Sequence, residues 1–319
     1  MTVDSSIPTS AGTEPTDRAP HAVSGGDIVR ALRLPFCAAG ALPYLAGAFV
    51  AVGSTRWDLF ALGLAAVVLT HLSANLTNDV ADDANTVDRQ DPRYFGFFGG
   101  SQLIQEGRLS RRAYLAGAVG CGAAAGVAVV LAAWLSGAWE AVGFFAAILL
   151  LGWSYSHPPL RLAGRGLGEL VVFLLFGPAC VVGGAYLQQG GWPGEAAWWV
   201  AVPMGLLTAA ILVANEVPDA GVDAAGGKRT LVVRIGATRG WLLLAGVLAA
   251  VYASIVAGVS IGAIRPWGLA SLGTIPLAGA VVDRVRRYRG PREAFVPVSK
   301  GVIVLQLIAA ALLLLGVIR

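Results

Sequence analysis

Two segments of the chain carry amide and carboxylate side chains at the same spacing. Both read Asn-x-x-x-Asp-x-x-x-Asp, and the six residues are Asn75, Asp79, Asp83, Asn215, Asp219 and Asp223. A spacing of four places side chains on one face of a helix, where like charges repel one another. At the end of the helix that carries the first segment, we expect one polar stripe of His71, Asn75, Asn78, Asp79 and Asp82. Carboxylates near the carboxyl end of a helix also oppose its dipole, so each segment needs a cation. Mg²⁺ prefers such oxygen ligands and keeps positions open for substrate phosphates, which predicts metal-assisted binding of a diphosphate.

Basic residues follow both acidic segments. Arg93 follows the first segment, and Lys228 and Arg229 follow the second one after a Gly-Gly pair. Their side chains would donate hydrogen bonds to the remaining phosphate oxygens. The alternative interpretation is that the acidic segments are solvated helix ends and that the basic residues anchor cytoplasmic loops. We favour diphosphate binding, because a purely structural protein gains nothing from two sets of repelling carboxylates.

The elements that carry these segments are strongly apolar. Of the 319 residues, 56% are hydrophobic and 13% are charged, which excludes a single soluble domain of ordinary composition. Nine apolar runs could each cross the membrane as a helix, at about 34–53, 58–80, 113–134, 138–156, 168–187, 197–216, 240–260, 266–283 and 301–318. The runs are continuous rather than alternating, which favours helices over a β-barrel. The sequence therefore predicts an all-α membrane protein, a bundle of nine transmembrane helices.

The positions of Lys and Arg predict how this bundle is oriented. With the N-terminus inside, all 23 of them except Arg56, Arg265 and Arg319 fall in the N-terminal segment or in loops after even-numbered runs. Basic residues concentrate in cytoplasmic loops, so we expect a multi-pass protein of the cell membrane with its N-terminus in the cytoplasm and its C-terminus outside. Both acidic segments, and with them the active site, would then lie on the cytoplasmic side.

The chain divides into a polar tail and a membrane domain. Residues 1–27 are rich in Ser, Thr, Pro and Gly, which predicts a disordered cytoplasmic tail before a domain of residues 28–319. The long loop at about 84–112 contains several glycines and suits a cap that excludes water from a reactive site. The net charge of +4 is explained by cytoplasmic loops, and we expect no nucleic-acid partner.

Five motifs, in this order along the chain, resemble those of the UbiA superfamily of intramembrane prenyltransferases. They are Asn78-Asp79-x-x-Asp82, Gly99-Gly100-Ser101-Gln102, Tyr155-Ser-His-Pro-Pro-Leu-Arg161, Gly166-Leu-Gly168-Glu169 and Gly227-Lys228-Arg229-Thr230-Leu231. The sequence resembles most the menaquinone-type branch, the 1,4-dihydroxy-2-naphthoate prenyltransferases, over about residues 30–319. This resemblance implies Mg²⁺-dependent transfer of an isoprenyl chain from its diphosphate to a lipophilic aromatic acceptor, in quinone biosynthesis.

The resemblance also implies roles for individual residues. The metal ligands would be Asn75, Asp79, Asp82, Asp83, Asp88, Asp219 and Asp223, with Asp82 and Asp83 as alternatives to each other. Residues in contact with the diphosphate and substrate would be Asn78, Arg93, Ser101, Asn215, Lys228 and Arg229. Tyr155 and Arg161 match positions near the allylic carbon and the leaving group. The chain departs from the branch at Glu216 and Pro218, where Asn and Arg are common.

Prenyl transfer also needs groups that face the allylic cation and a base. Aromatic rings such as Tyr155, Phe97 and Trp153 could lie against the cation. His71 and Glu169 are candidates for the base that removes the ring proton, beside the aspartates. The expected partners are an isoprenyl diphosphate, the aromatic acceptor and membrane lipid.

Three other functions fit the same residues. A terpene cyclase of the same fold would ionise the same diphosphate and close the chain on itself. A prenyltransferase of specialised metabolism would use another acceptor. An ion-coupled transporter would use the acidic residues to couple ions to transport.

Overall fold

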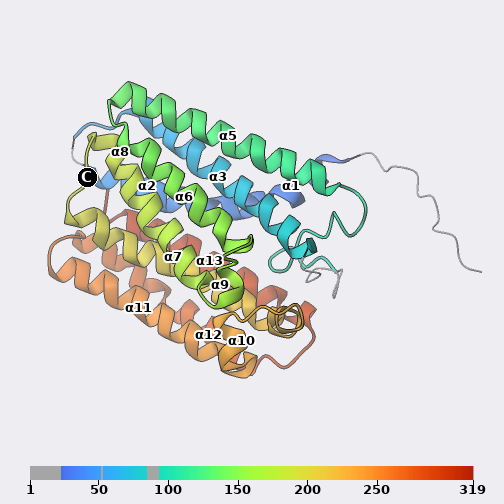
Figure 1. Ribbon diagram of the computed structural model, residues 1–319. Helices are drawn as coiled ribbons and strands as arrows, with labels where there is room; N and C mark the ends of the chain where they lie inside the picture. The colour runs from blue at the N-terminus through green and yellow to red at the C-terminus, as the bar shows by residue number, and fades with distance from the viewer. Residues whose placement is uncertain (1–22, 52, 85–92, 319) are drawn as a thin grey trace, which may run out of the picture.

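A computed structural model describes residues 23–51, 53–84 and 93–318, and these form helices joined by loops (Figure 1). The longer helices are α2 (Ala38–Val50), α3 (Trp57–Ala84), α5 (Arg111–Ser136), α6 (Glu140–Ser156), α8 (Cys180–Gln189), α9 (Glu195–Ala225), α11 (Gly240–Ser260), α12 (Ile275–Arg287) and α13 (Val296–Leu314). Shorter ones are α1 (Gly25–Leu32), η1 (Leu34–Cys37), η2 (Ala163–Arg165), α7 (Gly168–Leu174), η3 (Leu175–Ala179), α10 (Leu231–Ile235), η4 (Ala237–Arg239), η5 (Pro266–Thr274) and η6 (Arg292–Phe295).

Eight helical stretches of the described residues are long and apolar enough to cross a membrane. Several of them join two or three consecutive elements, as α7, η3 and α8 do over Gly168–Gln189. The fourth predicted run forms α6, an apolar helix of 17 residues. The all-helical membrane architecture predicted from the sequence is therefore confirmed, with eight candidate spans and one shorter apolar helix.

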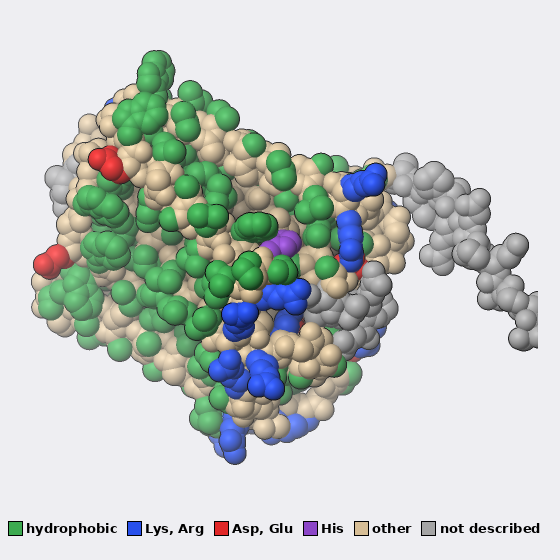
Figure 2. Space-filling view, in the orientation of Figure 1, with side chains coloured by type: hydrophobic (Ala, Val, Ile, Leu, Met, Phe, Trp, Pro, Cys, Tyr) green, Lys and Arg blue, Asp and Glu red, His purple; other side chains and the backbone are tan. Residues whose placement is uncertain are grey.

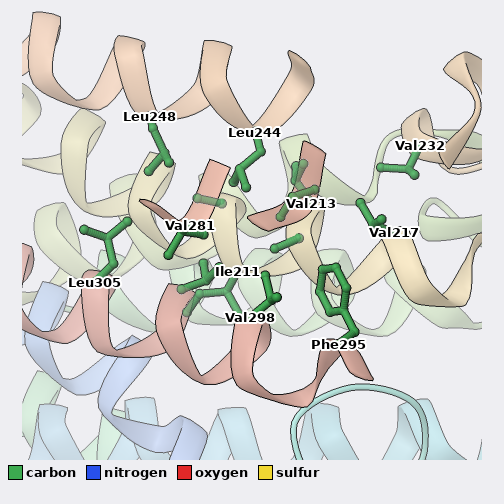
Figure 3. Packing of buried hydrophobic residues seen from close by; sticks show 14 of the residues in the cluster. Ile211, Val213, Val217, Val232, Leu244, Leu248, Val281, Phe295, Val298 and Leu305 are labelled. Atoms are coloured by element: carbon green, nitrogen blue, oxygen red, sulfur yellow. The ribbon is translucent and has the colours of Figure 1, made fainter. Parts of the chain in front are cut away.

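Helix α9 is the central helix of the bundle. Its buried residues face α11, α12, α13 and α10, and Figure 3 shows this cluster from close by. The side chains labelled there are Ile211, Val213, Val217, Val232, Leu244, Leu248, Val281, Phe295, Val298 and Leu305. A helix that is apolar on nearly all sides is buried among others, and this burial fixes the position of its carboxyl end, which carries the second acidic segment.

Small residues allow helices to approach closely around α9. A Cβ atom added to Gly205 would lie 2.6 Å from the carbonyl oxygen of Phe173 and 3.0 Å from the Cα of Gly177. Real Cβ atoms essentially never come within 3.0 Å of another heavy atom, so the contact of α9 with α7 and η3 requires glycine at this position. Close approach through small residues is typical of helix pairs in membranes.

The surface of the bundle is mostly hydrophobic. Figure 2 shows hydrophobic side chains over much of one face and Lys and Arg gathered toward the end where α10 and α12 lie. The exposed side chains include Trp134, Trp153, Trp192, Trp267 and Leu150, each more than half exposed. Exposed apolar side chains in this number match a protein that meets lipid.

The N-terminal boundary differs from the prediction by a few residues. Residues 25–27 were expected in the tail, but they form the first turn of α1. The reason is a capping box, in which the Ser24 side chain accepts from the Asp27 backbone N–H and the Asp27 side chain accepts from Ser24. The predicted disorder of residues 1–22 lies outside the described residues.

Candidate active site

A polar cavity of about 450 Å³ opens between the carboxyl ends of α3, α6 and α9. From α3 it is lined by Asn75, Asn78 and Asp82, and from α9 by Asn215, Glu216, Asp219 and Asp223. Both acidic segments therefore contribute side chains to one cavity, although they lie far apart in the sequence. This arrangement supports the prediction that the two acidic segments lie together at one site.

Lys228 links the two helices across this cavity. Its Nζ lies 2.7 Å from Asp82 Oδ1 on α3 and 3.4 Å from Asp223 Oδ1 on α9. Burial lowers the pKa of Lys228, but Asp82 and Asp223 outweigh this effect and raise it above its ordinary value. The ammonium group therefore stays charged and holds the carboxylates of α3 and α9 together.

The loop after α9 puts Lys228 in this position. Gly227 has φ of +79°, a conformation that favours glycine, and it lets the chain turn back over the end of the helix. The backbone N–H of Lys228 then donates to Asp223 O at 2.8 Å, and that of Arg229 donates to Gly164 O at 2.8 Å. The Gly-Gly-Lys-Arg sequence thus folds so that Lys228 points into the cavity, while the Arg229 side chain is exposed and does not line it.

The first acidic segment divides between two faces of α3. Asn75, Asn78 and Asp82 line the cavity, whereas Asp79 and Asp83 do not. A helix turns by 100° per residue, so position 82 comes back close to the direction of position 75, while position 83 is rotated by about 80°. Of the predicted polar stripe, His71, Asn75, Asn78 and Asp82 line the cavity and Asp79 does not. Asp83 does not line it either, whereas Asp223, at the same spacing from Asn215 on α9, does, so the two segments are not equivalent.

Asp79 and Asp83 bind residues that lie before and after α3 in the chain. Asp79 pairs with Arg33 and accepts from the backbone N–H of Ser101 at 3.3 Å. Asp83 pairs with Arg111 and accepts from Gln105 Nε2 at 3.3 Å. Both carboxylates are buried, and they fasten the segment before α5 to the end of α3.

Two arginines that the sequence interpretation missed lie beside the site. Arg33, which pairs with Asp79, lines the cavity, and Arg292 of η6 pairs with Asp219. Arg292 also lies over the rings of Phe95 and Phe98, 4.7 Å and 5.6 Å from their centroids. Neither arginine is near the aspartates in the sequence, so no local pattern indicated the pairing. Protein cations thus supply part of the charge that the sequence assigned to a metal.

Three asparagines face the cavity with fixed orientations. The Nδ2 atoms of Asn75 and Asn78 donate to Leu32 O at 3.2 Å and to Ser156 Oγ at 2.9 Å. Asn215 donates to Phe97 O at 2.9 Å and accepts from the Ser299 hydroxyl at 2.8 Å. With their nitrogens occupied, Asn75 and Asn78 can offer their amide oxygens to a cation.

Other predicted site residues separate into two groups. Tyr155, Arg161 and His71 line the cavity, and so does Phe97. Three of the predicted residues do not line the cavity. Arg93 pairs with Glu293 at the surface, Trp153 is exposed, and the buried Ser101 hydroxyl lies 2.6 Å from the Tyr114 hydroxyl.

Glu169 is buried and does not line the cavity either; one of its carboxylate oxygens accepts from the backbone N–H of Leu231 at 3.1 Å. Asp88 lies outside the described residues.

An apolar cavity of about 140 Å³ continues from the polar one between α3, α6 and α8. The two cavities share His71, Ala74, Gly152, Leu175 and Phe176. The far part is lined by residues such as Phe144, Phe145 and Ile148. A molecule with a charged head and an apolar chain could therefore place its head among the polar residues and its chain beyond His71.

The side chains of the described residues do not form a metal-binding cluster of their own. In that part of the chain, no group of three or more His, Cys, Asp or Glu lies close enough to hold an ion. The donor set in the cavity consists instead of three aspartates and three asparagines from two helices. These are hard oxygen donors, and Mg²⁺ is commonly bound through one or two carboxylates together with substrate phosphates, so the residues fit this ion.

Comparison with known proteins identifies the family. A family model described as the UbiA prenyltransferase family matches residues 40–299. The chain is 34% identical to the 1,4-dihydroxy-2-naphthoate octaprenyltransferase of Mycobacterium tuberculosis, over 80% of this chain and 83% of that protein. It is 27% identical to the 2-carboxy-1,4-naphthoquinone phytyltransferase of Synechocystis, over 82% of this chain and 83% of that one.

Solved structures share the fold at low sequence identity. A UbiA homolog from Aeropyrum pernix K1 has a TM-score of 0.63 and 19% identity, covering 89% of this chain and 94% of that chain. A UbiA homolog from Archaeoglobus fulgidus bound to DMAPP and Mg²⁺ has a TM-score of 0.62 and 16% identity, covering 90% and 99%. The helical bundle, its shared polar cavity and these matches together show that this chain is a prenyltransferase that belongs to the UbiA family.

Proposed function

We propose that the enzyme transfers an isoprenyl chain from its diphosphate to an aromatic acceptor of the 1,4-dihydroxy-2-naphthoate type, with Mg²⁺. The observation that carries this proposal is the polar cavity that α3 and α9 share, which continues into an apolar one. Relatives named for naphthoate and naphthoquinone substrates support the acceptor class.

The diphosphate would lie at the polar end of the cavity. Lys228 is charged and lines the cavity, and Arg33 and Arg161 line it as well. Guanidinium and ammonium groups donate strong hydrogen bonds to phosphate oxygens. Asp82, Asp219 and Asp223, with Asn75, Asn78 and Asn215 beside them, would hold Mg²⁺ through their oxygens. When bound, the ion would neutralise charge that develops on the leaving diphosphate.

The prenyl chain would extend past His71 into the apolar cavity. The shared residues Ala74, Gly152 and Phe176 form the passage between the two spaces. The allylic carbon would then lie near Tyr155, whose ring lines the polar cavity and could face a developing cation. The cavity wall would also limit access of water to that carbon.

We further propose that α6 is a ninth span, that the N-terminus is cytoplasmic and that the C-terminus is outside. At 17 residues, α6 is at the lower limit for crossing the hydrocarbon. The basic residues gathered near α10 and α12 support a cytoplasmic site, in the cell membrane. Reporter fusions after residue 318 should report an outside C-terminus, and a cytoplasmic signal would refute this topology.

The function is tested with the purified chain in lipid nanodiscs. Geranylgeranyl diphosphate is incubated with Mg²⁺, with and without 1,4-dihydroxy-2-naphthoate, and products are identified by mass spectrometry. We expect a prenylated naphthalene that requires both Mg²⁺ and the acceptor. A cyclic hydrocarbon formed without acceptor would refute the transferase proposal in favour of a cyclase, and uptake of substrate into vesicles without chemistry would favour a transporter.

A further inference from the structure

A third cavity adjoins the polar one, between α1, η1 and residues 94–100. It measures about 250 Å³, and we call it the α1 cavity. Four aromatic rings and two arginines line it, and these residues are Phe36, Tyr94, Phe97, Phe98, Arg30 and Arg33. The proposed function leaves this space without a role.

The α1 cavity and the apolar cavity meet the polar cavity at different walls. The α1 cavity shares with the polar cavity the residues Arg33, Phe36, Phe97, Phe98 and Gly99. The apolar cavity shares with it residues of α3, α6 and η3 instead. The polar cavity therefore has two separate extensions, of which one is apolar and the other carries positive charge and aromatic rings.

The aromatic wall of the α1 cavity is fixed by contacts with other elements. The carbonyl oxygen of Phe97 accepts from Asn215 Nδ2 on α9 at 2.9 Å. Phe98 is buried, and its ring lies edge-on to that of Phe295 in η6, 6.2 Å between centroids. The rings at the junction of the two cavities are therefore part of the packed bundle.

Arg30 supplies a charged group at the other side of the α1 cavity. Its two Nη atoms donate to the carboxylate of Glu106 at 2.6 Å and 3.1 Å, and its guanidinium carbon lies 3.9 Å from the centroid of the Tyr94 ring. A guanidinium has five N–H groups, so each Nη atom has a second N–H beyond the one that faces Glu106. Arg30 can therefore bind an anion while it keeps its ion pair.

A planar aromatic carboxylate matches this lining. Its rings can lie against aromatic side chains, and its carboxylate can accept hydrogen bonds from a guanidinium. A carboxylate is costly to place in hydrocarbon, so a molecule that carries one needs a polar route into the bundle. A prenyl chain has no such need, and the apolar cavity on the other wall matches it better.

We propose that the α1 cavity takes up the aromatic acceptor, with its carboxylate at Arg30 and its rings against Phe36 and Phe97, and delivers it past Gly99 to the polar cavity. This inference rests on the proposed function and names the route of its second substrate. The prenyl donor occupies the other extension, so the two substrates meet in the polar cavity. Arg30 then determines the preference for carboxylated acceptors and touches no reacting atom.

The first test uses two variants that break the same ion pair. Arg30→Gln removes the cation, whereas Glu106→Gln removes the anion and keeps the cation. Each variant is purified in lipid nanodiscs, and its folding is checked by thermal unfolding. The probes are 1-hydroxy-2-naphthoate, which carries a carboxylate, and 1-naphthol, which does not. Their binding is measured from their fluorescence, with empty nanodiscs as the blank.

The two variants should have opposite effects. Because hydrogen bonds between charged groups are strong, Arg30→Gln should weaken the binding of 1-hydroxy-2-naphthoate at least about fivefold. The same variant should change the binding of 1-naphthol less than about twofold. Glu106→Gln should bind 1-hydroxy-2-naphthoate at least as tightly as the wild type does.

The second test blocks the α1 cavity. Val29 of α1 lines it and is 44% exposed, whereas the adjacent Ile28 is 50% exposed and lines none of the three cavities. Val29→Trp should lower kcat/KM for 1,4-dihydroxy-2-naphthoate at least about tenfold and change the KM of geranylgeranyl diphosphate less than about twofold. Ile28→Trp is the matched control and should keep the wild-type values for both substrates.

The outcomes separate this inference from the proposed function. If the wild type prenylates the acceptor and Arg30→Gln binds 1-hydroxy-2-naphthoate as tightly as the wild type, the inference is overturned and the proposed function stands. Equal weakening in Arg30→Gln and Glu106→Gln would show a structural ion pair and would also overturn it. So would a raised KM for geranylgeranyl diphosphate in Arg30→Gln with unchanged binding of the naphthoate. If the wild type prenylates no aromatic acceptor, both proposals are overturned.

Discussion

Asp82 and Asp83 are adjacent in the sequence, yet the structure gives them different tasks. Asp82 lines the polar cavity and pairs with Lys228, while Asp83 faces Arg111 and Gln105. The substitutions Asp82→Asn and Asp83→Asn make the same chemical change on neighbouring residues of α3. We expect Asp82→Asn to remove activity and Asp83→Asn to affect mainly stability.

The magnitudes follow from burial and from the partner. The side chains of Asp82 and Lys228 are 12% and 20% exposed, so the charge lost in Asp82→Asn lies in a mostly buried site. Loss of one preorganised charged contact at a reacting group lowers the rate by about 10²- to 10³-fold, or about 3 to 4 kcal/mol. For Asp83→Asn, Arg111 is 45% exposed and can turn to water, so we expect about 1 to 2 kcal/mol of lost stability and kcat/KM within about threefold.

The assay measures kcat/KM for prenyl transfer and the midpoint of thermal unfolding for both variants and the wild type. Activity is compared at a temperature where all three proteins are folded, so that a difference in stability does not change the rate. Equal loss of activity in both variants would refute the assignment of two faces on α3. So would an active Asp82→Asn variant.

Three further predictions concern Lys228, the apolar cavity and the helix contacts. Lys228→Met leaves two buried carboxylates without their shared partner, so kcat/KM should fall about 100-fold and unfolding should occur at lower temperature; a wild-type rate would contradict this. The pKa of Lys228 is raised in the folded state, so the charged side chain should stabilise the protein through neutral and mildly alkaline pH. This stabilisation should disappear only as the pH rises through the raised pKa, and Lys228→Met should show no such loss of stability. Ala74→Phe narrows the passage between the cavities and should lower kcat/KM for geranylgeranyl diphosphate at least about tenfold while changing that for dimethylallyl diphosphate less than threefold; equal effects on both donors would place the chain elsewhere. Gly205→Ala puts a Cβ 2.6 Å from Phe173 O and should lower stability by about 1 to 3 kcal/mol, whereas Gly279→Ala on α12, where nothing lies within 4 Å, should not lower it.

The bundle could be predicted from the sequence because its signal is continuous along the chain. In the described part of the chain, each of the nine apolar runs lies mostly in a helix or in consecutive helices, and the length of a run is enough to indicate a span. The α1 helix was not predicted, because it lies before the first apolar run and its Ser24 and Asp27 capping box stands in a polar segment. Local composition thus predicted the long elements and not the short one.

The site was predicted in part. The second acidic segment was placed correctly on one face of α9, since Asn215, Asp219 and Asp223 all line the cavity. On α3, four residues of the predicted stripe line the cavity, and they are His71, Asn75, Asn78 and Asp82. Asp79 was expected there too, but it pairs with Arg33 and accepts from the backbone of Ser101. Such contacts join residues distant in the sequence, which no spacing can indicate.

The basic partners of the aspartates illustrate the same limit. Arg33 and Arg292 were counted among the cytoplasmic cations because Arg33 precedes the first apolar run and Arg292 follows the eighth one. Their pairing with Asp79 and Asp219 depends on how α1, η6 and the ends of α3 and α9 meet. The two carboxylates therefore have protein partners before any substrate binds.

The central claim is that α3 and α9 form one site for a metal and a diphosphate. The most direct test measures Mn²⁺ binding by electron paramagnetic resonance in nanodiscs, with an unreactive thiolodiphosphate analogue of the prenyl donor. We predict that the wild type and Asp83→Asn bind Mn²⁺ together with the analogue, and that Asp82→Asn and Asp219→Asn each weaken this binding at least about tenfold. Unchanged Mn²⁺ affinity in both Asp82→Asn and Asp219→Asn would contradict the claim.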